Sequence, residues 1–341
     1  MDEREPENLI FQVSAADQNV RLDSFLAEKI SDWSRSRLQR LIDDADVLVN
    51  GRQVKSSYKL ASADEIEVEL NVPDTESFEP ENIPLNVVFE DADIAVINKP
   101  AGMVVHPGAG VSSGTLANAA AFHFNLDSSQ LKTSQDLDEQ AKIQTLKSKI
   151  GIVHRLDKDT SGLIIFAKND SAQENLNEQF RTREVFKSYL ALVHGVTKEE
   201  RGTIDQPLAR DRTNRLRMTI NKMGRNAVTL WRVKERFERF TLVEVQIKTG
   251  RTHQIRVHLA SIKHPVVGDE IYNGGRDKTV MDVRVRTAIG KLGRFFLHAE
   301  KIGFKHPRTN EYLKFHAPLP DELEDFLSLL QSTDYLVKTE R

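Results

Sequence analysis

Apolar residues recur at helical and strand spacing in the first part of the chain. Residues 20–30 and 34–45 place apolar side chains three and four positions apart, which predicts two short helices. Residues 47–54 read VLVNGRQV, and the Asn-Gly pair between apolar residues predicts a hairpin of two short strands. Residues 64–70, DEIEVEL, alternate in polarity as a strand does. These segments together predict a small α+β unit.

A second region of strongly apolar segments begins after residue 84. Strands are predicted at 93–99, 162–168, 188–195 and 240–247. Helices are predicted at 115–124, 173–181, 252–263 and 321–332. The strands do not alternate strictly with long helices, so we expect an α+β domain built on a mixed β-sheet rather than a doubly wound α/β fold.

Composition shifts along the chain predict its division into domains. Residues 71–84 hold three prolines and several acidic residues, which is typical of a linker. Residues 127–149 are polar and lack aromatics, glycine and proline, and we interpret them as an exposed insertion. The expected division is an N-terminal tail 1–18, a small domain 19–72, a linker 73–84, a large domain 85–330 that includes the insertion, and a C-terminal tail 331–341.

The residue types that are absent exclude several classes of chemistry. The 341 residues include no cysteine, which rules out disulfides, thiolate metal sites and cysteine nucleophiles. The histidines show no tight ligand pattern such as HExxH, so we expect no metal. The first residues resemble no signal peptide, and no run of apolar residues is long enough to span a membrane. We therefore expect a cytoplasmic protein with no membrane partner.

Charge is distributed unevenly. The net charge is −3, but residues 1–100 carry 22 acidic against 10 basic side chains, whereas residues 201–260 carry 14 basic against 5 acidic ones. Such asymmetry is typical of a local basic surface that binds an anion. A solvated strand surface with its counter-charges elsewhere explains the same numbers, and composition alone does not decide between them.

The stretch HRLDKDTSGL, residues 154–163, concentrates charge directly before an apolar strand. Asp157 lies two residues from Arg155 and next to Lys158, and nearby cations favour the ionised form of a carboxylate. An anionic aspartate in this setting can act as a nucleophile or as an electrostatic stabiliser. Alternatively, Asp157 and Asp159 only cap a turn. Spacing does not separate these two aspartates.

Two other stretches combine charge or a hydroxyl with a predicted element. In KTGRTHQIRVHLA, residues 248–260, a strand stops before Gly250 and Thr252 is a candidate N-cap of the next helix. Arg251 and Arg256 then flank a strand–helix junction, where backbone N–H groups also attract anions. In FKSYLALVHG, residues 186–195, Tyr189 begins an apolar strand. Surface cations and a core tyrosine are the simpler interpretations.

Taken together and in order, these stretches resemble a known family. IAVINKPAGMVVHP, GIVHRLDKDTSGLIIFAK, FKSYLALVHG and KTGRTHQIRVHLASIKHPVVGD are similar to the motifs of RluA-type pseudouridine synthases. The unit at 19–72 resembles the αL-type RNA-binding domain first known from a ribosomal protein. The order of the two domains is similar to the RluC/RluD branch, which modifies large-subunit ribosomal RNA. The insertion at 127–149 is longer than this resemblance leads us to expect.

The resemblance implies a role for individual residues. It implies that Asp157 is the nucleophile that isomerises a flipped-out uridine to pseudouridine, that Tyr189 stacks on the base and assists proton removal, and that Arg256 pairs with Asp157. It also implies substrate contacts for His154, Arg155, Arg251 and an apolar pocket wall at Leu297. Uridine isomerisation is not a redox reaction, so no cofactor is expected.

RNA is the partner that the resemblance implies, most simply 23S ribosomal RNA or its precursor. Arg35, Arg37 and Arg40, on the second predicted helix, are candidates for contacts between the small domain and RNA. We expect a monomer. A transfer RNA substrate, a non-catalytic RNA-binding protein of the same fold, and a carbohydrate hydrolase are the alternatives. The hydrolase usually needs a second catalytic carboxyl group.

Overall fold

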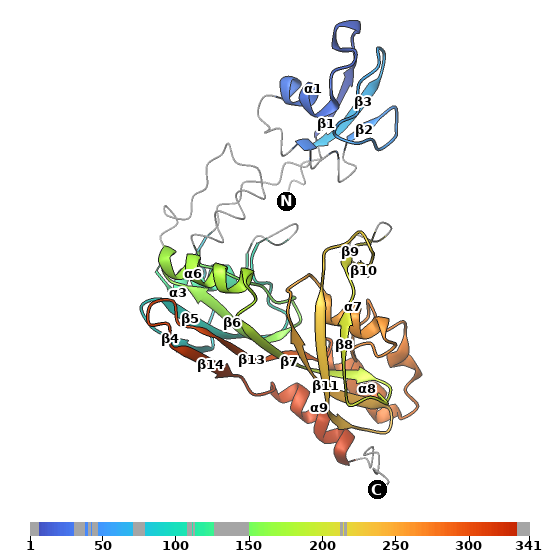
Figure 1. Cartoon of the computed structure of the whole chain (residues 1–341). Helices are drawn as coiled ribbons and strands as arrows, with labels where there is room; N and C mark the ends of the chain where they lie inside the picture. The colour runs from blue at the N-terminus through green and yellow to red at the C-terminus, as the bar shows by residue number, and fades with distance from the viewer. Residues whose placement is uncertain are drawn as a thin grey trace. The chain divides into compact units, whose positions relative to one another are not determined.

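The computed structural model has two compact units, each with its own buried core (Figure 1). The residues that it describes are 7–30, 38–39, 42, 47–70, 79–107, 111, 113–125, 150–211, 214 and 217–332. The small unit contains the described residues up to position 70, and the large unit contains those from position 79 onward. Among these residues, no helix combines the length and apolar character needed to cross a bilayer.

The small unit is a three-stranded antiparallel sheet with a helix. Strand β3 (Glu65–Leu70) lies between β1 (Glu7–Gln12) and β2 (Val47–Val49). Helix α1 (Leu22–Lys29) follows a short 3-10 turn (Ala15–Asp17). The apolar positions that predicted this helix are buried in the core of the unit, namely Leu22, Phe25 and Leu26.

The N-terminal segment differs from the prediction. Residues 1–18 were expected to form a tail, but from Glu7 onward the chain forms β1, which pairs with β3 along its whole length. Leu9 and Phe11 pack against the core, and the Phe11 ring meets Phe25 edge-on at 6.1 Å. Two alternating apolar residues were too weak a signal to predict a strand. The strand is stabilised by its pairing with β3, which the local pattern does not reveal.

The predicted hairpin at 47–54 is smaller than expected. Asn50 and Gly51 both adopt left-handed backbone conformations, with φ of 51° and 70°, as an Asn-Gly turn requires. After the turn, however, only Arg52 bridges back, to Val49. The second strand of the hairpin is therefore reduced to one residue pair, and β2 finds its main partner in β3.

Several predicted features lie outside the described residues. Most of the second predicted helix is among them, including Arg35, Arg37 and Arg40, and so is the whole polar insertion at 127–149. Two apolar positions of that helix are described, Leu38 and Ile42, and both are fully buried. The end of the predicted linker belongs to the large unit, because Asn118 binds the carbonyl of Glu79 and accepts from the amide of Glu81 with its own carbonyl.

The large unit is built on a nine-stranded mixed sheet, which confirms the predicted fold class. Its strand order is β4-β5-β6-β13-β7-β12-β11-β8, with β14 beside β13. Only the β6–β13 contact is parallel among these strands, and the other pairs are antiparallel. The strands are β4 (Val87–Glu90), β5 (Ile94–Lys99), β6 (Ser161–Ala167), β7 (Phe186–His194), β8 (Arg201–Asp205), β11 (Val228–Arg236), β12 (Phe240–Ile247), β13 (Leu297–Lys305) and β14 (Tyr312–His316).

A separate two-stranded hairpin and several helices complete the large unit. The hairpin pairs β9 (Leu208–Arg210) with β10 (Met218–Ile220). The helices are α3 (Leu116–His123), α6 (Asp170–Arg181), α7 (Gln254–Ser261), α8 (Val283–Leu292) and α9 (Asp321–Ser332), with a 3-10 turn at Arg276–Thr279. The C-terminal helix α9 agrees with its prediction from the apolar spacing of residues 321–332.

Strand β6 is buried along its entire length because both of its faces are covered. Leu163 and Ile165 share a core with Leu176 of α6, which crosses this part of the sheet in Figure 1. Phe166 points to the opposite face, where the Phe124 ring after α3 lies 6.0 Å away. This two-sided burial explains the continuous apolar run in the sequence.

Gly162 is required where β6 meets β13. It has a φ of 114°, and a Cβ at this position would lie 2.3 Å from the carbonyl oxygen of Ala299. The obstacle is backbone of the neighbouring strand, so it cannot move aside as a flexible side chain would. The close parallel contact between Gly162 and Ala299 therefore depends on the missing side chain.

We predict that Gly162→Ala destabilises the large unit by at least about 2 kcal/mol, from backbone strain and from the clash with Ala299. Urea denaturation followed by circular dichroism measures the change. Gly290→Ala is the matched control, because Gly290 lies in α8 with open space around it. That variant is expected to be as stable as the wild type or up to about 1 kcal/mol more stable. Equal stability of the two variants would contradict the prediction.

Candidate active site

Asp157 lies in a tight turn directly before β6. The amide of Thr160 donates to the carbonyl of Asp157 at 3.1 Å, which closes the turn, and Thr160 and Ser161 are both buried. The Asp157 side chain itself remains 18% exposed. The charged turn therefore places one carboxylate at the edge of the buried sheet, where it is held firmly and still reaches solvent.

Arg256, the second predicted site residue, approaches Asp157 from helix α7. Its Nη1 atom lies 3.4 Å from Oδ2 of Asp157, although the two residues are 99 positions apart. The shorter bonds go to Asp269, from Nε at 2.6 Å and from Nη2 at 2.8 Å. Burial acts to lower the pKa of Arg256, but these two carboxylates together raise it, so the guanidinium remains charged.

Asp269 is the partner that the sequence analysis missed. It is fully buried, and besides Arg256 its carboxylate accepts the backbone N–H groups of Ile271 and Tyr272. The only signal in the sequence was its place at the end of the quoted HPVVGD segment. A two-point interaction with Asp269 fixes the plane of the Arg256 guanidinium and leaves Nη1 directed at Asp157.

Tyr189 and Leu297 share one face of the sheet. Leu297, the first residue of β13, pairs with Ala191 of β7, and paired residues point to the same side as Tyr189 two positions earlier. Both side chains are almost fully buried. Burial and the negative charge of Asp157 raise the pKa of Tyr189, so its phenol stays protonated. The two residues form an apolar wall with one hydroxyl.

His154 and Arg155 occupy different environments. The Nε2 atom of His154 accepts the amide of Ile165 in β6 at 2.9 Å, and its ring lies against Phe180 at 4.8 Å. Burial lowers the pKa of His154 to about 3, which keeps this acceptor neutral. Arg155 is exposed. The contacts of His154 anchor the turn to β6 and α6, while Arg155 projects from the same segment toward solvent.

The start of α7 is arranged differently from the prediction. Thr252 was expected to cap this helix, but the N-cap residue is His253, with φ of 54° and no capping bond from its side chain. Gln254 ties the junction together instead, because its Oε1 accepts the hydroxyl of Thr249 and the amide of Arg251. The side chain of Arg251 binds the carbonyl of Asn226 at 3.3 Å. The bonds to Gln254 and Asn226 hold Arg251 at the junction.

A buried lysine braces the Asp157 turn. The ammonium group of Lys99 donates to the carbonyls of Pro100, Met103 and Lys158 at 2.7 to 2.9 Å. Burial, together with the charge of Arg294, lowers the pKa of Lys99 to about 7, whereas the three carbonyl acceptors favour the ammonium form. Lys99 thus links the NKPAG segment to the residue that follows Asp157.

A polar network fixes the other end of the turn. The hydroxyl of Ser161 lies 2.9 Å from Nδ1 of His298, and Arg294 donates to the same hydroxyl at 3.0 Å. Arg294 also donates to the carbonyl of Leu297 and to Glu322 in α9. This network joins β6, β13 and α9. Of its members only Leu297 was singled out from the sequence, and for its side chain rather than for this carbonyl.

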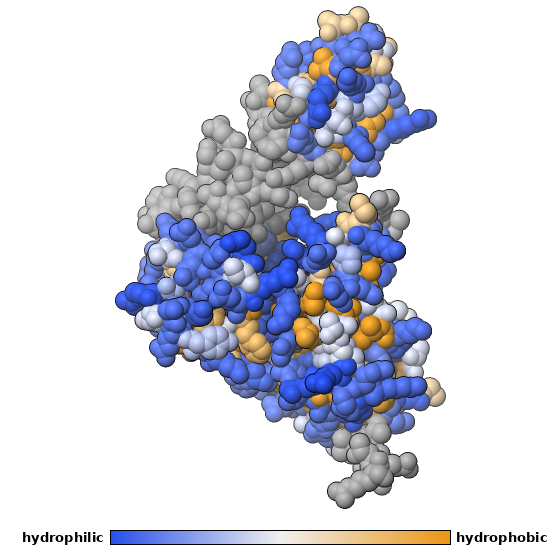
Figure 2. Space-filling model, in the orientation of Figure 1, coloured by the Kyte–Doolittle hydropathy of each residue, from blue (hydrophilic) through white to orange (hydrophobic). Residues whose placement is uncertain are grey.

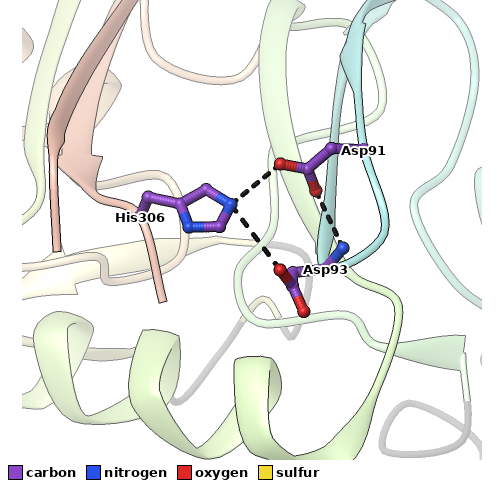
Figure 3. A group of neighbouring side chains, drawn as sticks. All are labelled: Asp91, Asp93 and His306. Atoms are coloured by element: carbon purple, nitrogen blue, oxygen red, sulfur yellow. Dashed lines mark hydrogen bonds and ion pairs between the residues drawn. The ribbon is translucent and has the colours of Figure 1, made fainter. Parts of the chain in front are cut away.

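One group of side chains in the described part of the chain is close enough to hold a metal ion: Asp91, Asp93 and His306 (Figure 3). His306 contacts Asp91 through Nε2 at 2.8 Å, and its Nδ1 accepts the amides of Arg308 and Thr309. Because Nδ1 accepts, Nε2 carries the proton and is not available as a metal ligand.

The aspartates of this group also have protein partners. Asp91 accepts the amides of Asp93 and Ile94, and Asp93 binds Arg308 at 2.7 Å. The group is therefore a hydrogen-bonded clamp between the β4–β5 turn and the β13–β14 turn. Its chemistry does not fit a resident metal site.

Comparison with known proteins identifies the family of the chain. The family described as RNA pseudouridylate synthase matches residues 93–261, and the S4 domain matches residues 20–66. An uncharacterized RNA pseudouridine synthase, YlyB, from Bacillus subtilis is 42% identical over 318 residues, which are 93% of this chain and 96% of the relative. Ribosomal large subunit pseudouridine synthase D from Pasteurella multocida is 40% identical over 327 residues, 95% of each chain.

Two solved human structures are also similar. RNA pseudouridylate synthase domain containing 4 has a TM-score of 0.54 at 25% identity, covering 72% of this chain and 93% of its own. RNA pseudouridylate synthase domain containing 1 has a TM-score of 0.51 at 24% identity, covering 75% and 98%, and supports the fold. The chain, with its S4 domain followed by a mixed-sheet domain, belongs to the RluA-type family of RNA pseudouridine synthases.

Proposed function

We propose that this enzyme converts specific uridines of large-subunit ribosomal RNA to pseudouridine, with Asp157 as the nucleophile. The main support is the pairing of a partly exposed Asp157 with a buried, charged Arg256 whose Nη1 lies 3.4 Å away. The relatives named ribosomal large subunit pseudouridine synthase D, about 40% identical over nearly the whole chain, support the choice of substrate.

The reaction needs a carboxylate that remains ionised. Isomerisation breaks the bond between the ribose and N1 of uracil and forms a bond to C5. The electrons stay within the substrate, one proton leaves C5, and N1 gains one. An aspartate can form a transient covalent bond to the nucleotide, which divides the rearrangement into two easier steps. The fixed charge of Arg256 favours the anionic form of Asp157 that such a bond requires.

The target uridine must leave its base stack to reach Asp157. Exposed Arg155 is suited to occupy the space that the base vacates. Tyr189 and Leu297 then provide the apolar wall against which the flipped base stacks. Since the phenol of Tyr189 is held protonated, it can take the proton from C5 only as it passes its own proton to water. His154 and Arg251 support this pocket through the turn and the α7 junction, respectively.

The small unit supplies a second contact with RNA in this proposal. Arg35, Arg37 and Arg40 lie within the residues matched by the S4 domain, and three cations there would neutralise phosphates. The basic segment 201–260 contributes a further phosphate-binding surface on the large unit. A local basic surface reconciles RNA binding with the overall charge of −3.

The direct test is to incubate the enzyme with 23S ribosomal RNA transcript and with transfer RNA, and to map pseudouridine by carbodiimide modification and primer extension. The proposal expects discrete new pseudouridines in the ribosomal transcript. Modification of transfer RNA alone would replace the proposed substrate. No pseudouridine in either RNA would contradict the proposed function.

For the nucleophile, we predict that Asp157→Asn lowers kcat by about a thousand-fold or more while RNA affinity stays near the wild-type value. The amide keeps the size of the side chain but cannot act as the nucleophile, and phosphate contacts supply most of the binding. Asp159→Asn is the matched control, two residues away in the same turn, and should lose less than about ten-fold. Single-turnover kinetics and filter binding measure both effects. Near-normal turnover by Asp157→Asn would place the nucleophile elsewhere.

For the tyrosine, we predict that Tyr189→Phe lowers kcat by about a hundred-fold and leaves KM almost unchanged. The ring that stacks on the base remains, and only the hydroxyl that handles the proton is lost. Tyr312→Phe, at a half-exposed position on β14, is the matched control and should behave as the wild type. Steady-state kinetics on the RNA that the wild type modifies measure kcat and KM of both variants. Full activity of Tyr189→Phe would mean that Tyr189 is only a packing residue.

A further inference from the structure

The β9–β10 hairpin rests on the helix that carries Arg256. Its buried base consists of Leu208, Ala227 and Val257, and the last of these belongs to α7. Figure 1 shows the hairpin extending away from the large sheet beside α7. Backbone bonds from Gln206 to Ala227 and between Leu208 and Arg225 continue the β8–β11 ladder into its base, and beyond them β9 and β10 pair with each other. Packing against α7 therefore helps to set the position of the hairpin.

The outer surface of the hairpin has the chemistry of an RNA contact. Arg217, Lys222 and Arg225 are exposed around it, and Met223 at the following turn is 93% exposed. Figure 2 shows hydrophilic residues over most of this face of the large unit. Cations pair with phosphates, and an apolar side chain among them can cover the face of an unstacked base. RNA beside the target nucleotide is the occupant that this charge favours.

Tyr272 connects the hairpin to the active-site helix by two hydrogen bonds. Its hydroxyl accepts the amide of Met218, the first residue of β10, at 2.7 Å. The same oxygen lies 2.8 Å from Nδ1 of His253, the N-cap residue of α7. Burial lowers the pKa of His253, so its ring is a neutral acceptor for the tyrosine proton. One hydroxyl therefore joins β10 to the start of α7.

The ring of Tyr272 makes the second connection. It lies 5.1 Å from the guanidinium carbon of Arg256 and 5.5 Å from that of Arg217. Phe295 covers Arg256 from 4.1 Å, and Asp269 holds its edge. Arg256 thus has two aromatic rings and the Asp269 carboxylate around it, and its Nη1 is directed at Asp157. Tyr272 is the one of these neighbours that also contacts the hairpin.

The contact between Arg256 and Asp157 is the longest of the three side-chain hydrogen bonds of Arg256 and the easiest to change. A charged nitrogen–oxygen hydrogen bond is usually about 2.7 to 2.9 Å long, whereas this one measures 3.4 Å. A small displacement of Arg256 is enough to close that gap. Catalytic contacts often tighten only when substrate is bound.

We propose that Tyr272 is a positioning residue through which binding of RNA to the β9–β10 hairpin brings Arg256 onto Asp157. This inference rests on the proposed function, because it deepens how the same site responds to its RNA. It assigns Tyr272 no contact with the reacting atoms. Its hydroxyl hydrogen-bonds β10 and the start of α7, so a movement of β10 moves α7. Its ring packs beside the Arg256 guanidinium and maintains the orientation of that group toward Asp157.

The kinetic test uses Tyr272→Phe, which keeps the ring and removes both hydrogen bonds. On a 23S ribosomal RNA transcript, kcat should fall about ten-fold with KM nearly unchanged, within the usual range of coupling between sites. Lys222→Gln/Arg225→Gln, which weakens the hairpin's grip on RNA, should lower kcat and raise KM. Because both changes break one coupling, the combined variant should have a kcat no lower than that of the more severe parent. Tyr312→Phe again serves as the control.

Independent losses that multiply in the combined variant would overturn the proposal, as would a wild-type kcat for Tyr272→Phe. A second readout does not depend on turnover. Addition of the same transcript should slow amide hydrogen exchange in the hairpin of both the wild type and Tyr272→Phe. It should slow exchange in Gln254–Ser261 only in the wild type. Equal slowing of that helix in both proteins, or no slowing of the wild-type hairpin, would also overturn it. Absence of pseudouridine with the wild type would contradict the proposed function. The hydrogen-exchange result would still show whether RNA binding at the hairpin affects α7.

Discussion

The burial of Arg256 is the constraint on which the rest of the site depends. A charge placed among apolar groups is tolerated only where opposite charge and hydrogen bonds compensate for lost water. Asp269 provides that compensation with two short bonds, and the aromatic rings of Tyr272 and Phe295 cover the faces of the guanidinium. The one direction left is toward Asp157. A charge that is structurally satisfied can therefore still act on a second carboxylate.

The Asp157 turn is held by an equivalent arrangement on its other side. Lys99 and Arg294 are both buried cations, and each is satisfied mainly by backbone carbonyls or hydroxyls around this turn. The negative charge of Asp159 acts on both of them, which gives this second aspartate a structural role distinct from that of Asp157. The close β6–β13 contact at Gly162 then fixes the start of β6. Three buried cations from separate parts of the chain thus converge on one short segment.

The sequence predicted the elements better than it predicted their contacts. Local apolar spacing was sufficient for α1, α6, α9 and the buried strand β6, because each buries a complete face. The N-terminal strand was missed because two alternating apolar residues acquire meaning only when β3 lies beside them. The N-cap of α7 was misassigned because the chain enters the helix through a left-handed His253, which no local rule anticipates, while Gln254 binds the preceding residues Thr249 and Arg251.

Site contacts were harder still, since spacing along the chain carries no information about a pair 99 residues apart. Asp157, Tyr189 and Arg256 were found through the family resemblance, not through periodicity. Asp269, Lys99, Arg294 and Tyr272 contact Arg256 or the residues around the Asp157 turn, and each has a common structural explanation when considered alone. Only their joint geometry distinguishes them from ordinary core residues.

The mechanism that we propose relies on one ionised aspartate, and the same geometry is consistent with that requirement. A hydrolase with two catalytic carboxyl groups must hold one of them protonated and the other ionised. This requires one environment that raises a carboxyl pKa and another that keeps it low. Here the nearby groups all favour a single state: Arg256 stays charged, and Tyr189 and His253 stay neutral. The enzyme therefore needs little change of protonation before substrate arrives. What remains to be set is distance, and the 3.4 Å separation of Arg256 and Asp157 is the variable that RNA binding is best placed to change.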